Sequence, residues 1–258
     1  EGTADLIEWA SDALSIQQRS LLCWSIVSLL LPTRDDLLNL ITRLMRRVLA
    51  SSTGDNVMRQ DSLTTTLLTQ ALRIAGRSRL EDALDSLGVS GVKQADIDHV
   101  VEVLDKLVTP DSLLNDLLVS VAKVACERFP DEPHLVRRVL SNVYILRFAN
   151  PLLIALLNGN PLNQQLAKGV QAAANVAAAA TPRLEDVTVG SQCLRALFER
   201  LRDAQTELPA KSGNQNNVEP RCCDWMALIC HLLHLAVTSR EGAPQVYHDK
   251  RLLSCQMT

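Results

Sequence analysis

Apolar residues recur along most of this sequence at spacings of three and four, the period of a helix that buries one face. A clear example follows Thr109-Pro110-Asp111, which predicts a helix start because Thr can cap a helix and Pro suits its first turn. The apolar face of that predicted helix contains Leu113, Leu114, Leu117, Leu118, Val121, Val124 and Ala125. No segment shows the alternation of apolar and polar residues that indicates a β-strand. The pattern therefore predicts an all-α fold.

Proline, glycine and polar clusters set the predicted helix boundaries. The predicted helical ranges are 5–31 (one or two helices), 33–50, 61–75, 79–87, 96–107, 109–129, 134–149, 162–180, 192–204 and 223–237. Gly76 is expected to end one helix and Pro151 to end another. Residues 51–56 predict a loop, and residues 209–220 predict a linker.

The composition agrees with packed helices. Hydrophobic residues make up 47% of the 258 positions but aromatic residues only 3%, so Leu, Ala and Val must fill the core. The net charge of -3 predicts no general affinity for nucleic acid or acidic membranes. The seven cysteines lack a disulfide-framework spacing and indicate reduced thiols, as in a cytoplasmic protein.

Neither a membrane span nor a leader is predicted. The longest early apolar run, residues 21–31, ends at Pro32 and is too short to cross a bilayer. The first residues do not resemble a signal peptide. Because the sequence opens on Glu-Gly-Thr without an initiator Met, we expect a fragment of a longer protein.

Arg147 is a single cation inside a strongly apolar segment, residues 143–154. A buried lone charge is costly unless its donors are satisfied, and Arg offers five donors in a fixed fork. Arg147 could therefore tie together several carbonyl groups of a nearby loop. The alternative is an amphipathic helix with Arg147 on its exposed face.

A polar stripe marks the predicted helix 162–180. Gln164, Lys168, Gln171 and Asn175 fall on one side of this helix at about 100° per residue. The opposite side carries Leu166, Val170, Ala173 and Ala177. Amides and one Lys flanked by alanines make a flat face that another backbone could approach. The alternative is an ordinary solvated face.

Other chemistry is weakly indicated. Cys222, Cys223, Cys230, His231 and His234 lack a Cys-x-x-Cys pair, so we predict no metal site. The remaining histidines have no recognisable triad partners. No Walker-type glycine loop is present, so the chain is not expected to bind nucleotide alone.

Three blocks of sequence resemble the catalytic domain of Ras GTPase-activating proteins, the RasGAP family that includes neurofibromin. The strongest is Arg128-Phe-Pro-Asp131 followed by Tyr144-Ile-Leu-Arg-Phe-Ala-Asn-Pro151, similar to the family's Phe-Leu-Arg-Phe signature with a following Pro. The second is Asn56-Val-Met-Arg-Gln-Asp-Ser-Leu63, which is similar to the family's Thr-Leu-Phe-Arg-Gly-Asn-Ser-Leu. The third is residues 168–175, which resemble Lys-x-x-Gln-x-x-x-Asn. The blocks keep the family's order and a compatible spacing.

The resemblance implies a role for each matching residue. Arg59 would be the arginine finger, and Arg147 would stabilise the finger loop. The implied partner-binding residues are Met58, Ser62, Leu63, Asn150, Pro151, Lys168, Gln171 and Asn175.

The resemblance also implies a GTPase activator that acts in trans, with no independent catalytic activity. The partner would be a Ras-family small GTPase in its GTP state, which holds the GTP and Mg itself; this chain would need no cofactor of its own. Any contact with a membrane would be indirect, through the partner or other domains. The RasGAP-like domain would cover residues 33–205, with flanking helices in 1–32 and a linker and helical extension in 206–258.

The chain departs from the family pattern at several positions. Met58 replaces a Phe, Gln60-Asp61 replaces Gly-Asn, and Thr66 and Gln164 stand where lysines often occur. One alternative is therefore a non-catalytic helical scaffold that binds a GTP-loaded GTPase. Another is a helical interaction scaffold unrelated to GTPases.

Overall fold

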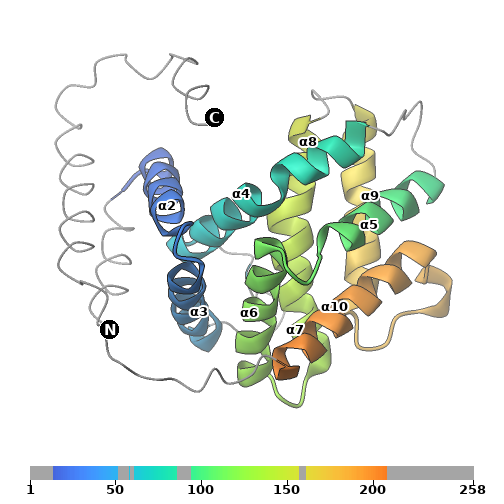
Figure 1. Cartoon of the computed structure of the whole chain (residues 1–258). Helices are drawn as coiled ribbons and strands as arrows, with labels where there is room; N and C mark the ends of the chain where they lie inside the picture. The colour runs from blue at the N-terminus through green and yellow to red at the C-terminus, as the bar shows by residue number, and fades with distance from the viewer. Residues whose placement is uncertain (1–13, 52–57, 59–60, 86–93, 157–160, 208–258) are drawn as a thin grey trace. The chain divides into compact units, whose positions relative to one another are not determined.

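The computed structural model describes residues 14–51, 58, 61–85, 94–156 and 161–207. Within these residues the secondary structure is entirely helical, which confirms the predicted all-α class (Figure 1). The elements are α2 (Ile16–Leu30), α3 (Arg34–Ser51), α4 (Leu63–Asp85), α5 (Gln94–Leu107), α6 (Leu113–Arg128), α7 (Pro133–Ser141), the π-helix η2 (Asn142–Ala149), α8 (Asn150–Leu156), α9 (Pro161–Ala178), the 3-10 turn η3 (Leu184–Asp186) and α10 (Val189–Glu207).

One compact unit spans Arg19–Gly213. Residues 1–18 and 214–258 fall outside it, and of these the structure describes only residues 14–18. The Cys and His residues weighed as a metal site lie outside the described residues. None of the described helices has the length and apolar character needed to cross a membrane.

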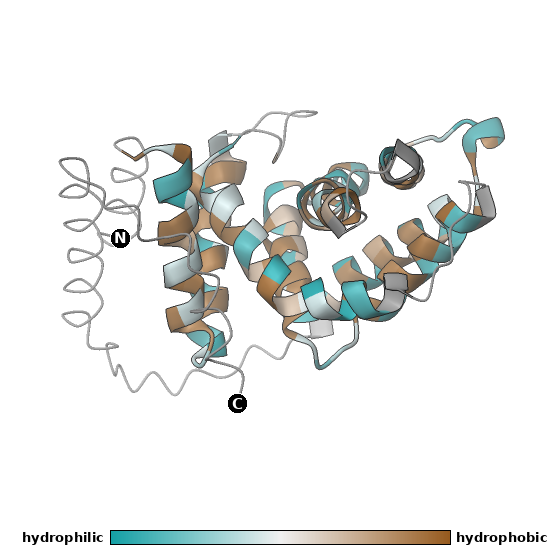
Figure 2. Ribbon diagram, turned by 90° about the horizontal axis from the view of Figure 1, so that it is seen from above, coloured by the Kyte–Doolittle hydropathy of each residue, from teal (hydrophilic) through white to brown (hydrophobic). Residues whose placement is uncertain are grey.

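Helix α6 occupies the core of this unit and packs against α3, α4, α7 and α10. Many of the helices carry hydrophobic residues on one side and hydrophilic residues on the other (Figure 2). Helix α6 begins three residues later than the sequence predicted. Ser112, and not Thr109, is its N-cap, because the Ser112 hydroxyl accepts a hydrogen bond from the Asn115 amide at 3.1 Å.

Helix α4 is continuous through Gly76, so the predicted stop there and the separate helix 79–87 are wrong. Gly76 is buried where α4 approaches η2. A Cβ at this position would lie 2.6 Å from the Phe148 ring and 3.3 Å from the Leu114 side chain. Gly76 thus allows close helix packing, and the tertiary contacts override its local tendency to end a helix.

The predicted stop before Pro151 is also wrong, because α7, η2 and α8 follow one another without a break. Pro lacks an amide donor and its ring clashes with the carbonyl four residues earlier in an α-helix. The π-helical turns before Pro151 widen that spacing: the Asn150 amide donates to the Ile145 carbonyl, five residues back.

The core side of η2 is fixed by two stacked rings. Tyr144 and Phe148 are fully buried, with ring centroids 5.5 Å apart. The Tyr144 hydroxyl donates to the Leu104 carbonyl of α5 at 2.7 Å. These contacts set the rotation of η2, and Leu146 and Arg147 are left half-buried on its other side.

Candidate functional site

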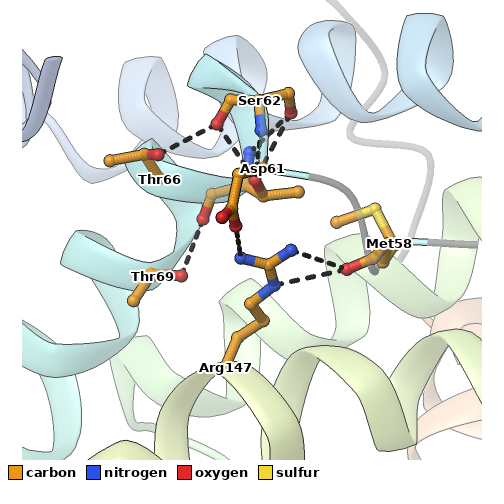
Figure 3. A network of polar contacts seen from close by, with 7 residues as sticks. Met58, Asp61, Ser62, Thr66, Thr69 and Arg147 are labelled. Atoms are coloured by element: carbon orange, nitrogen blue, oxygen red, sulfur yellow. Dashed lines mark hydrogen bonds and ion pairs between the residues drawn. The ribbon is translucent and has the colours of Figure 1, made fainter. Parts of the chain in front are cut away.

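Arg147 is the centre of a polar network that joins η2 to the residues just before α4. Its Nε and Nη2 donate to the Met58 carbonyl at 3.3 and 3.2 Å, and its Nη1 pairs with Asp61 Oδ1 at 2.5 Å (Figure 3). The Arg147 side chain is only 16% exposed, so it does not lie on an exposed helix face. One guanidinium therefore links the residues on either side of positions 59 and 60.

Met58 holds a backbone conformation that methionine rarely adopts. Its φ is 62°, in the left-handed region, and its side chain is buried at 2% exposure. Such a conformation costs about 1–3 kcal/mol and persists only when the surroundings hold it in place. Here the buried side chain and the two hydrogen bonds from Arg147 supply that support. Arg59, the implied finger, is the next residue and lies outside the described residues.

Asp61 is 88% exposed, yet its carboxylate is paired with Arg147. The acid that stands two residues after Arg59 is thus at least partly compensated by a cation that reaches it from η2. Exposed ion pairs contribute only about 0–1 kcal/mol, so the link to Met58 is the stronger part of the network.

Ser62 and Leu63 begin α4 and are engaged within the fold. The Thr65 amide donates to the Ser62 hydroxyl at 3.2 Å, and the Ser62 amide donates to the Thr65 hydroxyl at 2.9 Å. This reciprocal pair is a capping box. Leu63 is buried at 2% exposure, so its side chain packs in the core and is not part of a surface in this structure. The cap fixes where α4 starts, and hence where Asp61 lies.

A row of amides connects α8 to α9. Asn150 Nδ2 donates to Gln171 Oε1 at 2.9 Å, and Gln171 Nε2 donates to Asn175 Oδ1 at 3.3 Å. Lys168 is exposed on the same helix and makes no hydrogen bond or ion pair within the part of the chain that the structure describes. The structure thus brings Asn150, Gln171 and Asn175 together, with Lys168 on the same side of α9.

A pocket of about 350 Å³ lies beside the network, lined by Asp61, Thr69, Arg73, Leu146, Arg147 and Pro151. It joins the start of α4 to Pro151, so it brings two of the predicted regions to one place. Arg73 was not predicted. It lies between Leu72 and Ile74, but Thr69 and Gln70 precede it and Arg77 follows one turn later, so its sequence context is less apolar than that of Arg147.

No metal site is visible in this region: the described residues contain no group of three or more His, Cys, Asp or Glu side chains that could hold an ion. The described cysteines, Cys23, Cys126 and Cys193, are free thiols. The chemistry of the site therefore consists of guanidinium, carboxylate and amide groups.

Comparison with protein-family models and with curated proteins gave no match for this chain.

Proposed function

We propose that this chain is a GTPase-activating protein that binds a GTP-loaded Ras-family small GTPase and inserts Arg59 into the partner's nucleotide site. The observation that carries the proposal is the contact of Arg147 with both Met58 and Asp61. These two residues bracket position 59, and a finger arginine needs a segment that is braced at its base.

The reaction explains why arginine is required. Water attacks the γ-phosphorus of GTP, the bond to the β–γ bridging oxygen breaks, and GDP and phosphate leave. Negative charge is shared among the γ-phosphate oxygens and the bridging oxygen in the transition state. A planar guanidinium can donate to two of these oxygens at once, and a lysine ammonium is a point charge. The partner would hold GTP and Mg, while this chain would supply the additional cation.

The amide row supports a contact with a protein partner. Asn150, Gln171 and Asn175 are joined by hydrogen bonds, so their orientations are set before a partner arrives. Ordered amides lose less conformational entropy on binding than free ones. In this proposal the row, together with Lys168 and Pro151, receives the switch regions of the GTPase.

The direct test is single-turnover GTP hydrolysis by a panel of Ras-family GTPases, with wild type and Arg59→Ala. For the established Ras–RasGAP pair the finger contributes about 10³–10⁵ in rate. We expect Arg59→Ala to lose most of the stimulation for at least one GTPase, and Arg59→Lys to fail similarly. Arg43→Ala is a matched control, because Arg43 is exposed on α3 and unpartnered among the described residues.

Two results would overturn the mechanism. Equal stimulation by wild type and Arg59→Ala would remove Arg59 from catalysis. The wild-type protein could instead prefer the GTP-loaded over the GDP-loaded GTPase in a pull-down without accelerating hydrolysis. That result would identify the non-catalytic scaffold.

A further inference from the structure

The pocket beside Arg147 is lined by a second guanidinium, that of Arg73. Arg73 lies one turn after Thr69 on α4, and among the described residues it makes no hydrogen bond or ion pair. Its Nε is buried without an acceptor. Because Arg73 lines the pocket and has no ion-pair partner among the described residues, an anion in the pocket would supply a counter-charge.

The charges around Arg73 also favour the binding of an anion in the pocket. Burial lowers the pKa of Arg73, and the like charge of Arg77 lowers it further. Arg77 itself is paired with Glu81 at 2.7 Å, and Asp61 is paired with Arg147. Both of these carboxylates are thus engaged with other arginines, and among the described residues Arg73 has no ion-pair partner.

The other residues that line the pocket restrict the chemical class of the ligand. Thr69 donates its hydroxyl proton to the Thr65 carbonyl at 2.7 Å, so it has no proton left for an anion. Leu146 and Pro151 are apolar walls. The donors therefore come from guanidinium groups, whose fork matches the two oxygens of a carboxylate. At about 30 Å³ per water, a volume of about 350 Å³ admits the end of a side chain.

We propose that this pocket receives an aspartate or glutamate side chain of the GTP-loaded GTPase, with Arg73 as the principal donor. The inference rests on the proposed function and adds one binding contact to it. The location of the pocket supports a protein ligand. Asp61 and Pro151, which line the pocket, are next to the two segments that the proposed function assigns to the contact with the GTPase.

The test measures the affinity of Arg73→Met for Ras-family GTPases loaded with a non-hydrolysable GTP analogue. Met retains the apolar stem, and Arg43→Ala again controls for the loss of one positive charge. We expect Kd to rise about tenfold to a hundredfold for Arg73→Met and to change little for Arg43→Ala, since a hydrogen bond to a charged group is lost. Arg73→Lys should recover part of the affinity.

A double-mutant cycle then identifies the ligand. Acidic residues of the GTPase are replaced one at a time by the corresponding amide, and one of them should lose its effect when Arg73 is Met. Wild type that binds and Arg73→Met that binds equally well would overturn this inference alone. Wild type that binds no GTPase would overturn the proposed function as well. A third outcome is that Arg73→Met binds the GTPase normally, while inorganic phosphate raises the melting temperature of wild type but not of Arg73→Met. That outcome would contradict the inference and identify a pocket for small anions.

Discussion

Replacing Arg147 with lysine keeps a positive charge but removes the planar fork that joins two residues at once. In the structure Nε and Nη2 both donate to the Met58 carbonyl, and Nη1 pairs with Asp61. A single ammonium can pair with the Asp61 carboxylate or donate to the Met58 carbonyl, but it does not reproduce the two donors aimed at one oxygen. Arg147→Lys therefore tests the brace separately from the charge.

The size of the effect follows from the conformation of Met58. A left-handed φ of 62° costs about 1–3 kcal/mol. Hydrogen bonds from a charged donor such as the Arg147 guanidinium stabilise the folded conformation by about 1.5–3 kcal/mol. Without them Met58 should leave this conformation, and the fraction of molecules with a correctly placed finger should fall about tenfold to a hundredfold. The expected loss of kcat is smaller than the 10³–10⁵ associated with the finger itself.

The assay is single-turnover GTP hydrolysis at saturating concentration, so that changes in affinity do not contribute. Arg147→Lys should lose about tenfold to a hundredfold, with an unchanged helical circular dichroism spectrum. The matched control is Asp61→Asn, which removes the ion pair but leaves both bonds to Met58. Because Asp61 is 88% exposed, its pair contributes about 0–1 kcal/mol, and we expect less than about a fivefold loss.

A second comparison asks whether Arg147 acts through Arg59. In the Arg59→Ala background, Arg147→Lys should change kcat little, because the group that it positions is already missing. Wild-type activity for Arg147→Lys, or an equal loss for Asp61→Asn, would refute the brace. Fully additive losses for the two substitutions would show that Arg147 contributes independently of the finger.

Two further predictions concern the fold. Gly76→Ala should lower the free energy of unfolding by about 1–3 kcal/mol, because the new Cβ would lie 2.6 Å from the buried Phe148 ring. Urea denaturation measures this change, and an unchanged midpoint would show that the ring can move aside. Burial raises the pKa of Cys23 to about 12, so the folded state keeps a proton that the unfolded state releases at lower pH. The contribution of Cys23 to the free energy of unfolding should therefore be fully present below about pH 9. Relative to Cys23→Ala, the free energy of unfolding should fall by about 1.4 kcal/mol per pH unit as the pH rises from there toward 12. Parallel pH profiles of stability for the two proteins would contradict the assignment.

The helical fold could be predicted because burial follows local periodicity. On α9, Leu166, Val170 and Ala177 are buried while Lys168 and Asn175 are exposed, as the stripe indicated. This agreement reflects a strong physical cause, since a helix in a packed unit must bury its apolar side.

The helix boundaries at Gly76 and Pro151 could not be predicted from local preferences. Gly76 has a reason to be glycine that lies 72 positions away in the sequence, at Phe148. Pro151 is accommodated because the preceding helix adopts i to i−5 hydrogen bonds, as the Asn150 bond to Ile145 shows. At Gly76 tertiary packing decided between two locally acceptable conformations, and at Pro151 the wider hydrogen-bond spacing of η2 did so.

The candidate site was predictable only in part, for a related reason. The lone charge of Arg147 in an apolar segment predicts that it needs partners, but Met58 and Asp61 lie 89 and 86 positions away in the sequence, so local pattern does not identify them. Arg73 has no comparable signal, because Thr69 and Gln70 precede it and Arg77 follows one turn later. The left-handed Met58 has no signal in the sequence, because methionine does not favour that conformation and only the surrounding contacts impose it.

The position of Arg147 is difficult to explain by stability alone. It lies in a π-helix whose core side carries the fully buried, stacked rings of Tyr144 and Phe148. An apolar side chain of similar size would avoid the desolvation of a guanidinium, and replacing buried ion pairs with packed apolar groups is often neutral or stabilising. The groups that Arg147 satisfies belong to Met58 and Asp61, at the edges of a two-residue segment before α4. In the proposed function, the cost of burying this charge is offset because Arg147 holds the strained Met58 next to the finger arginine.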